Sequence, residues 1–238
     1  MLGLVNVEDF IARIRQVDGT DDVSRIFTEE TKALGFEHHT CISVVDLNNP
    51  PLDAIQVFRF PQAWVEYYIR EEYYKYDVVI KTVLKNTGPY LWKALDVSDK
   101  RNRQIFAEAK EAGIRDGLTI PIALPGHYPC SINMAGDHTD IDPLNYHIVH
   151  LMAEYYLLRI VELSKSNRRL FDPPDLTPRE LECLVWMAKG KSDSEIGDIL
   201  SISHRTVNGY IENIRKKMDV GTRTQAVALA IVCGLIAP

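Results

Sequence analysis

Hydrophobic residues recur at helical spacing through the last quarter of the chain, in four short runs that each open on a capping residue. The stretch Thr177–Glu180 is a capping box with proline at the first helical position, where its missing N–H costs nothing. Ser192 and Glu195 form a second box, because a serine followed three residues later by a glutamate satisfies two free backbone N–H groups. Ser203 can cap a third helix and Thr222 a fourth. The pattern predicts four consecutive short helices.

The third of these helices has an apolar inner face and a polar outer face. The inner face carries Val207, Ile211, Ile214 and Met218, and the outer face carries Arg205, Asn208, Glu212, Arg215 and Lys216. Two short helices, a tight turn and a polar-faced third helix are the layout of a DNA-reading helix-turn-helix. Residues 203–223 carry five basic side chains against two acidic ones, a surplus suited to phosphate contacts. On spacing alone, a small helical bundle with a solvated charged face fits equally well.

The preceding part of the chain alternates between helical and strand patterns. Amphipathic spacing predicts helices over residues 7–17, 23–34, 63–72, 105–112 and 144–163. Short apolar or alternating runs predict strands over residues 41–45, 55–60, 118–122 and 131–134, the last two joined as a hairpin around Pro125-Gly126-His127. We therefore predict an α+β fold, in which an α/β/α sandwich with an antiparallel sheet and an interior pocket precedes an all-α domain of four helices.

The boundary between the two domains is marked by a change in composition. The helical pattern over residues 144–163 runs into the polar, basic stretch 164–169, and two adjacent prolines follow at positions 173–174. Paired prolines break a helix and stiffen a short connector. We predict a first domain over residues 1–165, a linker over residues 166–175 and a helix-turn-helix domain over residues 176–238.

The composition fits two modest globular domains. A chain of 238 residues that is 46% hydrophobic can build two cores. The net charge is −6, most of it before the linker, and an acidic first domain argues against a second nucleic-acid surface there. No segment reaches the ~18–20 consecutive apolar residues that a membrane span needs, and the N-terminus lacks the basic start of a secretory signal. We expect a cytoplasmic protein with no membrane partner.

Neither the cysteines nor the histidines indicate a metal site. The four cysteines are far apart and form no C-x-x-C pair, so they are expected to be buried filler: Cys41, Cys130, Cys183 and Cys233. His147 and His150 share a helical face, but no further ligand triad accompanies them. His38 and His39 are expected to point to opposite faces of a strand. We expect no metal and no cofactor.

Aromatic side chains gather around one acidic residue in the first domain. Trp64 and Tyr68 lie one helical turn apart, so both rings can point to one place. Asp77 and Trp92 follow later in the chain. A carboxylate in apolar surroundings can accept a ligand amide N–H, while an indole N–H and a phenol can donate to carbonyls. The alternative is an aromatic core in which Asp77 caps a helix, and these residues alone favour that alternative slightly.

The C-terminal motifs closely resemble the LuxR-type helix-turn-helix. The resemblance rests on the stretches 176–180, 190–192, 195–196 and 201–207. It implies that DNA is bound by Lys191, Ser192, Ser203, Arg205, Thr206, Asn208, Tyr210, Glu212, Asn213, Lys216 and Lys217. Asn208 and Tyr210 depart from the lysine and histidine that the family often has, and Gly209 is unusual inside a helix.

The first domain resembles the autoinducer-binding domain of LuxR-type quorum sensors, through the stretches 60–64, 90–92, 109–113 and 117–121. The resemblance implies an N-acyl-homoserine lactone as ligand. Trp64 would then bond the lactone carbonyl, Tyr68 the acyl carbonyl and Asp77 the amide N–H, while Trp92 would pack on the lactone ring. Further pocket residues implied are Phe60, Tyr76, Val79, Phe106, Ala109, Ile114, Thr119 and Asn133.

The resemblance implies a quorum-sensing transcription factor that binds a palindromic promoter element as a homodimer, with RNA polymerase as a further candidate partner. A phosphorylation-responsive or other ligand-responsive regulator with the same helix-turn-helix is the alternative, although the alternating strand–helix series of a receiver domain is missing. A lactone-hydrolysing enzyme is not expected, because neither a metal cluster nor a G-x-S-x-G stretch is present. A short, branched or aromatic acyl tail fits as well as a long straight one.

Two apolar surfaces are expected to pair the two copies of a dimer. The fourth helix of the second domain carries Val227, Ala230 and Ile231, and part of that face is expected to meet its twofold mate. We therefore expect a charge at Ala230 to abolish operator binding and to spare lactone binding. The long helix over residues 144–163 offers the second surface.

Overall fold

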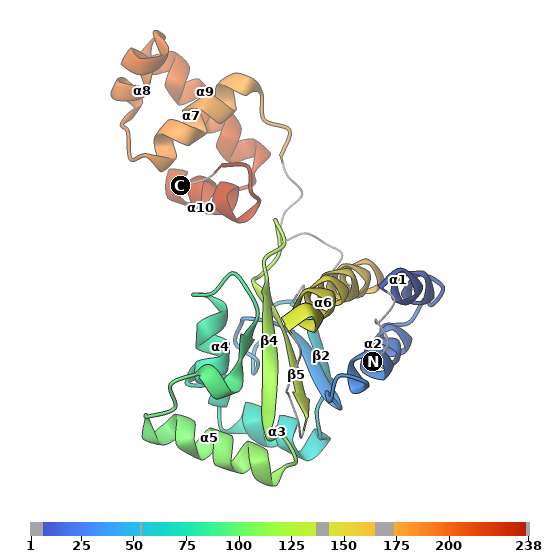
Figure 1. The fold of residues 1–238 in the computed structure, drawn as a ribbon. Coiled ribbons are helices and arrows are strands. Elements are labelled where there is room, and N and C mark those ends of the chain that lie inside the picture. The colour runs from blue at the N-terminus through green and yellow to red at the C-terminus, as the bar shows by residue number, and fades with distance from the viewer. Residues whose placement is uncertain (1–6, 53, 137–142, 165–173, 237–238) are drawn as a thin grey trace. The chain divides into compact units, whose positions relative to one another are not determined.

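A computed structural model describes residues 7–52, 54–136, 143–164 and 174–236. The described residues form two compact units, one built from helices α1 to α6 with a sheet, the other from helices α7 to α10 (Figure 1). The predicted linker over residues 166–175 lies outside the described residues except for its last two positions, so the domain boundaries stay a prediction. Each unit is described by itself.

The N-terminal unit is organised by a five-stranded antiparallel sheet in the order β2-β1-β5-β4-β3. Its strands are β1 His38–Ser43, β2 Gln56–Arg59, β3 Tyr90–Leu91, β4 Asp116–Ile122 and β5 Cys130–Gly136. β5 occupies the centre and is buried along its whole length. The register places Asn133 of β5 opposite Thr40 of β1 on one side and Thr119 of β4 on the other. These three side chains therefore form a row on one face of the sheet.

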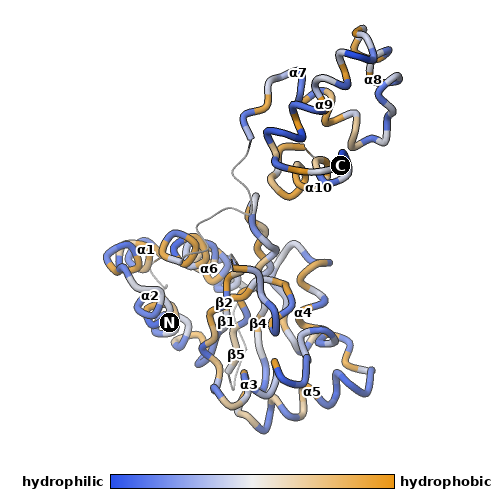
Figure 2. The backbone as a smooth tube through the Cα atoms, turned by 180° about the vertical axis from the view of Figure 1, so that it is seen from behind, coloured by the Kyte–Doolittle hydropathy of each residue, from blue (hydrophilic) through white to orange (hydrophobic). Residues whose placement is uncertain are grey.

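Helices cover both faces of this sheet, which confirms the predicted α/β/α sandwich. On one face lie α1 Val7–Arg15, α2 Thr20–Lys32 and α6 Pro143–Leu163 (Figure 1). Their apolar sides and the facing strand positions form the larger core, which contains Phe10, Phe27, Met134 and Met152. Figure 2 shows how hydrophobic positions follow α6 and the strands. Alternate strand residues turn to the opposite face.

The opposite face of the sheet carries shorter elements. They are α3 Gln62–Arg70, η1 Tyr73–Lys75, α4 Val78–Val83, η2 Trp92–Ala94 and α5 Lys100–Glu111. The sequence pattern predicts α3 and α5 but not α4, because a six-residue apolar run cannot be told from a strand by its spacing. The caps of α4 and α5 are the side chains of Asp77 and Asp99, each of which accepts a backbone N–H.

The predicted roles of the cysteines and of the first histidine pair agree with the structure. All four cysteines are buried and free. His39 points into the larger core, where its ring contacts the Tyr156 hydroxyl at 2.9 Å, and His38 lies on the other face of β1. Burial lowers the pKa of His39 to about 3, so its imidazole is neutral and serves packing.

The C-terminal unit consists of α7 Pro178–Ala188, α8 Asp193–Leu200, α9 His204–Lys217 and α10 Arg223–Val232. Every predicted cap is present, and Thr177, Ser192 and Thr222 each complete a reciprocal capping box. α9 packs against both α7 and α8 around one apolar core. Within the described residues, no helix is long and apolar enough to cross a membrane.

The turn between α8 and α9 is tight enough to require a glycine. Ser201 adopts a left-handed conformation with φ of 55°, which folds the chain back on α8. A Cβ atom on Gly197 would lie 2.8 Å from the carbonyl oxygen of Ile202. Gly197 therefore allows the backbone of the turn to pack directly against α8.

The prediction that Ala230 lies on the dimer face of α10 is wrong. That residue is fully buried in the core with Ala226, whereas Ile231 and Val232 remain 38% and 43% exposed. Buried positions recur along α10 at intervals of three and four residues, and this rotation turns Ala230 inward. A charge at Ala230 would destabilise the core of the unit, so a loss of operator binding would not report on dimerisation.

Candidate ligand pocket and nucleic-acid interface

An apolar pocket lies between the sheet and the elements α3, α4, η2 and α5. Most of its lining side chains are aliphatic or aromatic, and few are polar. They are Thr40, Ile42, Leu47, Phe58, Phe60, Trp64, Val65, Tyr68, Asp77, Val79, Ile80, Trp92, Ile105, Phe106, Ala109, Ile114, Arg115 and Asn133. An apolar chamber with a few convergent polar groups is the ordinary form of a small-molecule site.

Two aromatic residues of α3 project into this pocket from successive turns. The rings of Trp64 and Tyr68 lie 5.8 Å apart between centroids, as their spacing of four residues predicts. The Tyr68 hydroxyl donates to Oδ2 of Asp77 at 2.8 Å. Among the described residues, no hydrogen-bond acceptor lies at the Trp64 indole N–H. The α3 face thus offers one free donor and one donor that is bonded to a neighbouring acid.

Asp77 caps α4 and faces the pocket at the same time. Its Oδ1 accepts the backbone N–H of Val79 at 2.8 Å, while Oδ2 holds Tyr68. The capping role weighed from sequence and the pocket role are therefore compatible. Burial raises the pKa of the Asp77 carboxyl to about 6, although the hydrogen bonds from Tyr68 and Val79 and the charge of Lys81 act in the opposite direction. A further donor at this carboxylate would favour its ionised form.

A chain of hydrogen bonds runs across the sheet at the floor of the pocket. The Trp92 indole N–H donates to the Thr119 hydroxyl, and Thr119 donates to Oδ1 of Asn133, each at 2.8 Å. The Asn133 amide donates to Thr40 at 2.9 Å and to Ser131 at 3.1 Å. The strand register brings Thr119, Asn133 and Thr40 side by side, and the hydrogen bond from Trp92 to Thr119 fixes the orientation of the indole ring.

The backbone beneath Trp92 has no room for a side chain. A Cβ atom on Gly117 would lie 2.7 Å from two carbons of the indole. With its N–H bonded to Thr119 and its ring resting on Gly117, Trp92 presents only a ring face to the pocket.

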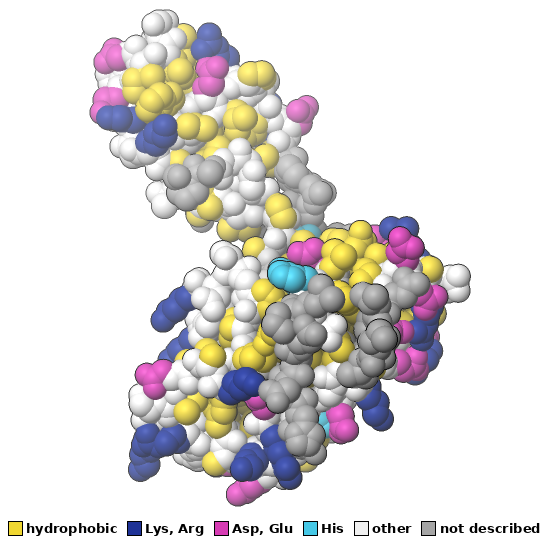
Figure 3. Space-filling view, in the orientation of Figure 1, with side chains coloured by type: hydrophobic (Ala, Val, Ile, Leu, Met, Phe, Trp, Pro, Cys, Tyr) yellow, Lys and Arg dark blue, Asp and Glu magenta, His cyan; other side chains and the backbone are white. Residues whose placement is uncertain are grey.

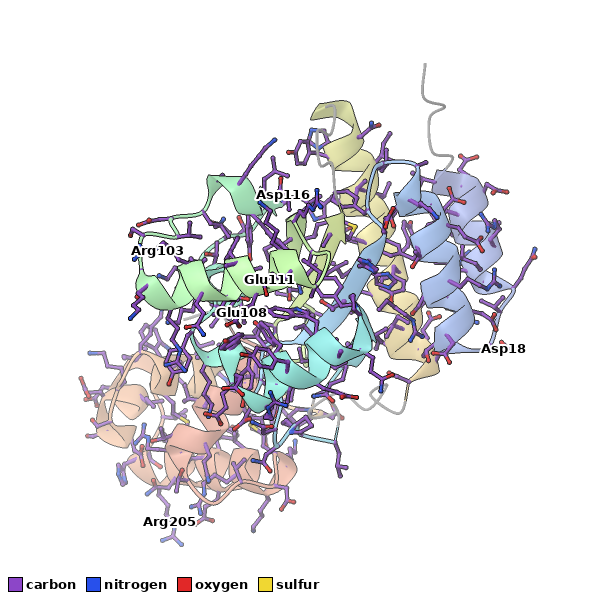
Figure 4. The ribbon with its side chains drawn as sticks, turned by 90° about the horizontal axis from the view of Figure 1, so that it is seen from below. Asp18, Arg103, Glu108, Glu111, Asp116 and Arg205 are labelled. Carbon is purple, nitrogen blue, oxygen red and sulfur yellow. The ribbon has the colours of Figure 1, made fainter. Side chains whose placement is uncertain are left out.

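On α5, Glu108, labelled in Figure 4, accepts a hydrogen bond from the Tyr73 hydroxyl at 2.6 Å. This bond connects α5 to η1.

Ten of the predicted pocket residues line the pocket: Phe60, Trp64, Tyr68, Asp77, Val79, Trp92, Phe106, Ala109, Ile114 and Asn133. Two do not line it. Thr119 lies behind Trp92 and supports it, and Tyr76 instead stacks under the guanidinium of Arg101, 3.4 Å from its ring centroid. Sequence reasoning missed Thr40, Ile42, Leu47, Phe58, Val65, Ile80, Ile105 and Arg115. The two-residue alternation from Phe60 back to Phe58 was the available signal.

The outer face of α9 is polar and accessible. The exposed predicted residues are Ser203, Arg205, Thr206, Glu212, Asn213, Lys216 and Lys217, while Asn208 and Tyr210 are half-buried. Figure 4 shows Arg205 projecting from the C-terminal unit, and Figure 3 shows basic and acidic side chains interspersed on the visible face of this unit. Ser192 and Ser203 cap α8 and α9, and Lys191 pairs with Glu195 at 3.0 Å.

Two basic residues of α9 are engaged inside the unit. The Lys217 ammonium contacts Oε2 of Glu180 at 2.7 Å, and the Glu180 side chain is 3% exposed. Lys217 also donates to the Asp175 carbonyl at 2.9 Å. Arg215, predicted to face outward, is half-buried and donates to the Gly221 carbonyl. Lys217 therefore has a structural partner, and its contact with a phosphate stays a prediction.

Comparison with known proteins identifies both units. Residues 19–160 match the autoinducer binding domain, and residues 174–230 match the domain of bacterial regulatory proteins of the LuxR family. The chain belongs to the LuxR-type family of quorum-sensing transcriptional regulators, as its motifs predict.

Several individual relatives are similar over most of the chain. A putative HTH-type transcriptional regulator, y4qH of Sinorhizobium fredii, is 32% identical over 80% of this chain, a match that spans 59% of that relative's length. The HTH-type quorum-sensing regulator RhlR of Pseudomonas aeruginosa is 29% identical over 94% of each chain. The crystal structure of Escherichia coli SdiA has the same fold, with a TM-score of 0.68 over 98% of both chains at 23% identity.

The Lys217–Glu180 pair predicts a difference between two adjacent lysines. Lys217→Ala removes the charged partner of a buried carboxylate, so we expect the free energy of unfolding to fall by about 1–3 kcal/mol. Lys216→Ala removes an exposed side chain and should change it by less than about 0.5 kcal/mol. Urea unfolding of the two variants measures both values, and equal stability would show that the pair contributes nothing.

Proposed function

We propose that this regulator binds an N-acyl-homoserine lactone in the pocket of its N-terminal unit and reads DNA with the outer face of α9. The observation that carries the first part is the convergence of Trp64, Tyr68 and Asp77 on one apolar chamber. An acyl-homoserine lactone has two carbonyls, one amide N–H and an apolar tail. The pocket offers two donors, one acceptor and an apolar wall in matching number.

In this proposal each polar group has one role. The Trp64 indole N–H donates to the lactone carbonyl, the Tyr68 hydroxyl donates to the acyl carbonyl, and Asp77 accepts the amide N–H. Tyr68 and Asp77 now bond each other, so a ligand that takes one partner from each leaves neither unsatisfied. Trp92, whose indole N–H is already engaged, packs its ring face on the lactone.

The proposed regulatory step is stabilisation of the N-terminal unit by its ligand. A molecule enclosed in this pocket binds the folded state only, and at a hundredfold excess over its dissociation constant it adds about 2.7 kcal/mol to stability. The stabilised protein would act as a homodimer on a palindromic site, with one α9 in each of two successive major grooves. No catalytic step is proposed, because the family consists of transcriptional regulators.

The raised pKa of Asp77 predicts that ligand affinity depends on pH. The empty pocket holds a carboxyl with a pKa of about 6, and a donated amide N–H favours its ionised form. We therefore expect lactone affinity to fall about tenfold from pH 7 to pH 5. Asp77→Asn should weaken binding at pH 7 by about 1.5–3 kcal/mol and should abolish the pH dependence.

Thermal-shift titrations of both proteins with a series of acyl-homoserine lactones measure these changes. The variant should remain folded when empty. Folding raises the pKa of the Asp77 carboxyl, so the free energy of unfolding of the unmodified protein falls as the pH rises from about 4 to about 6. The neutral amide of Asp77→Asn does not titrate and removes that fall. An unchanged titration in Asp77→Asn, or an equal pH dependence in both proteins, would contradict the assignment.

The exposed residues of α9 predict two distinct effects on DNA. Glu212→Ala should change the preferred base at one position of each half-site, because Glu212 is exposed on α9 and a glutamate can accept from the amino group of a cytosine. Lys216→Ala should weaken binding to all sequences alike and lower the salt slope by about one. Selection from a randomised DNA pool, followed by titration at several salt concentrations, distinguishes the two. An unchanged selected motif for Glu212→Ala would refute this register.

The exposed apolar pair on α10 predicts the dimer contact that Ala230 cannot provide. Ile231→Glu places a charge at a position that is 38% exposed, so the C-terminal unit should remain folded while the liganded homodimer weakens. Sedimentation at micromolar concentration should show more monomer and lower operator affinity. Unchanged sedimentation would place the contact elsewhere.

A further inference from the structure

A glycine occupies the middle of the outer face of α9. Gly209 follows Arg205 by four residues and precedes Glu212 by three and Asn213 by four, and all four residues are exposed. The buried side of the helix, with Val207, Ile211 and Ile214, faces the opposite way. Residues three and four apart are neighbours on a helix surface, so Gly209 lies between the side chains that the proposed function assigns to DNA.

Nothing inside the described C-terminal unit requires glycine at this position. Gly190 and Gly234 have positive φ angles of 76° and 68°, and a Cβ on Gly197 would meet the Ile202 carbonyl. Gly209 has neither property. Its φ lies outside the left-handed region, and an ideal Cβ would meet no described heavy atom within 4 Å apart from its chain neighbours and the nearby backbone of α9 itself.

Glycine in this place opposes helix formation. Glycine is the poorest helix former after proline, because it exposes backbone to water and loses more conformational freedom than alanine does. α9 nevertheless keeps it in its interior, where the fold would accept alanine without a clash. The structure of the isolated unit does not explain why position 209 is a glycine. A molecule that approaches this face of α9 and leaves no room for a side chain would explain it.

We infer that Gly209 is a positioning residue that lets the α9 backbone approach the base edges of the major groove more closely than any side chain would permit. Arg205 and Glu212 flank it, and their reach to the bases depends on that approach. The inference rests on the proposed DNA-binding function. In it, the depth to which α9 enters the major groove depends on a residue without a side chain.

A size series at position 209 tests this inference in the full-length protein. The protein is purified with a mixture of acyl-homoserine lactones, and the probe is a DNA duplex that the unmodified protein selects from a randomised pool. Gly209→Ala should raise the melting temperature of the C-terminal unit by ~2–6 °C and weaken DNA binding about tenfold. Gly209→Leu should bind still more weakly and remain folded.

Ser194→Ala is the matched control, because it replaces an exposed helical serine of α8 by a better helix former without a change of charge. It should leave DNA affinity within about twofold of the unmodified protein. If Gly209→Ala melts at a higher temperature but binds DNA as tightly as the unmodified protein, the inference is overturned and the proposed function is not. A Gly209→Ala variant that melts at a lower temperature also overturns the inference. If the unmodified protein selects no DNA at all, the proposed function fails and the inference fails with it.

Discussion

A carboxylate buried at the edge of an apolar pocket is the interaction on which the N-terminal unit depends. Asp77 holds the start of α4 through the Val79 N–H and holds α3 through the Tyr68 hydroxyl, so two walls of the pocket meet at one side chain. Burial makes the charge costly, and its pKa is raised to about 6. A ligand that donated to this acid, as proposed, would offset a cost already present in the empty protein, and ligand binding and folding would be coupled through the same carboxyl group.

The sheet supplies the rigid side of this arrangement. Its register aligns Thr40, Asn133 and Thr119 into a chain of hydrogen bonds that ends on the Trp92 indole. Polar groups inside the pocket floor are thus satisfied by one another and leave an apolar surface above them. The two donors and the acceptor of the proposed ligand site come from α3 and from the cap of α4. In the proposal, polar recognition therefore lies on one wall of the pocket, and the remaining walls make apolar contacts.

Local signals predicted the C-terminal unit better than the N-terminal one. Capping boxes are contained within four residues, so Thr177, Ser192 and Thr222 mark the helix starts without tertiary information. Asp77 could be read from its neighbours as a cap or as a ligand group, and only the resemblance to a family favoured the pocket. Tyr76 contacts Arg101 outside the pocket lining and Ala230 is buried, because the orientation of each depends on how a helix or turn rotates against its neighbours, which spacing alone does not fix.

The charges of α9 divide between holding the fold and facing solvent, and sequence cannot separate these roles. Lys216 and Lys217 are adjacent and chemically identical, yet Lys217 neutralises the buried Glu180 while Lys216 remains on the outer face. The difference arises because Glu180 is drawn inward by its reciprocal bond with the backbone of Thr177, and a buried acid requires a counter-charge. The capping box of α7 therefore determines which lysine of α9 stays free. A surplus of basic residues counted along a recognition helix overstates the charge that the helix can offer to DNA.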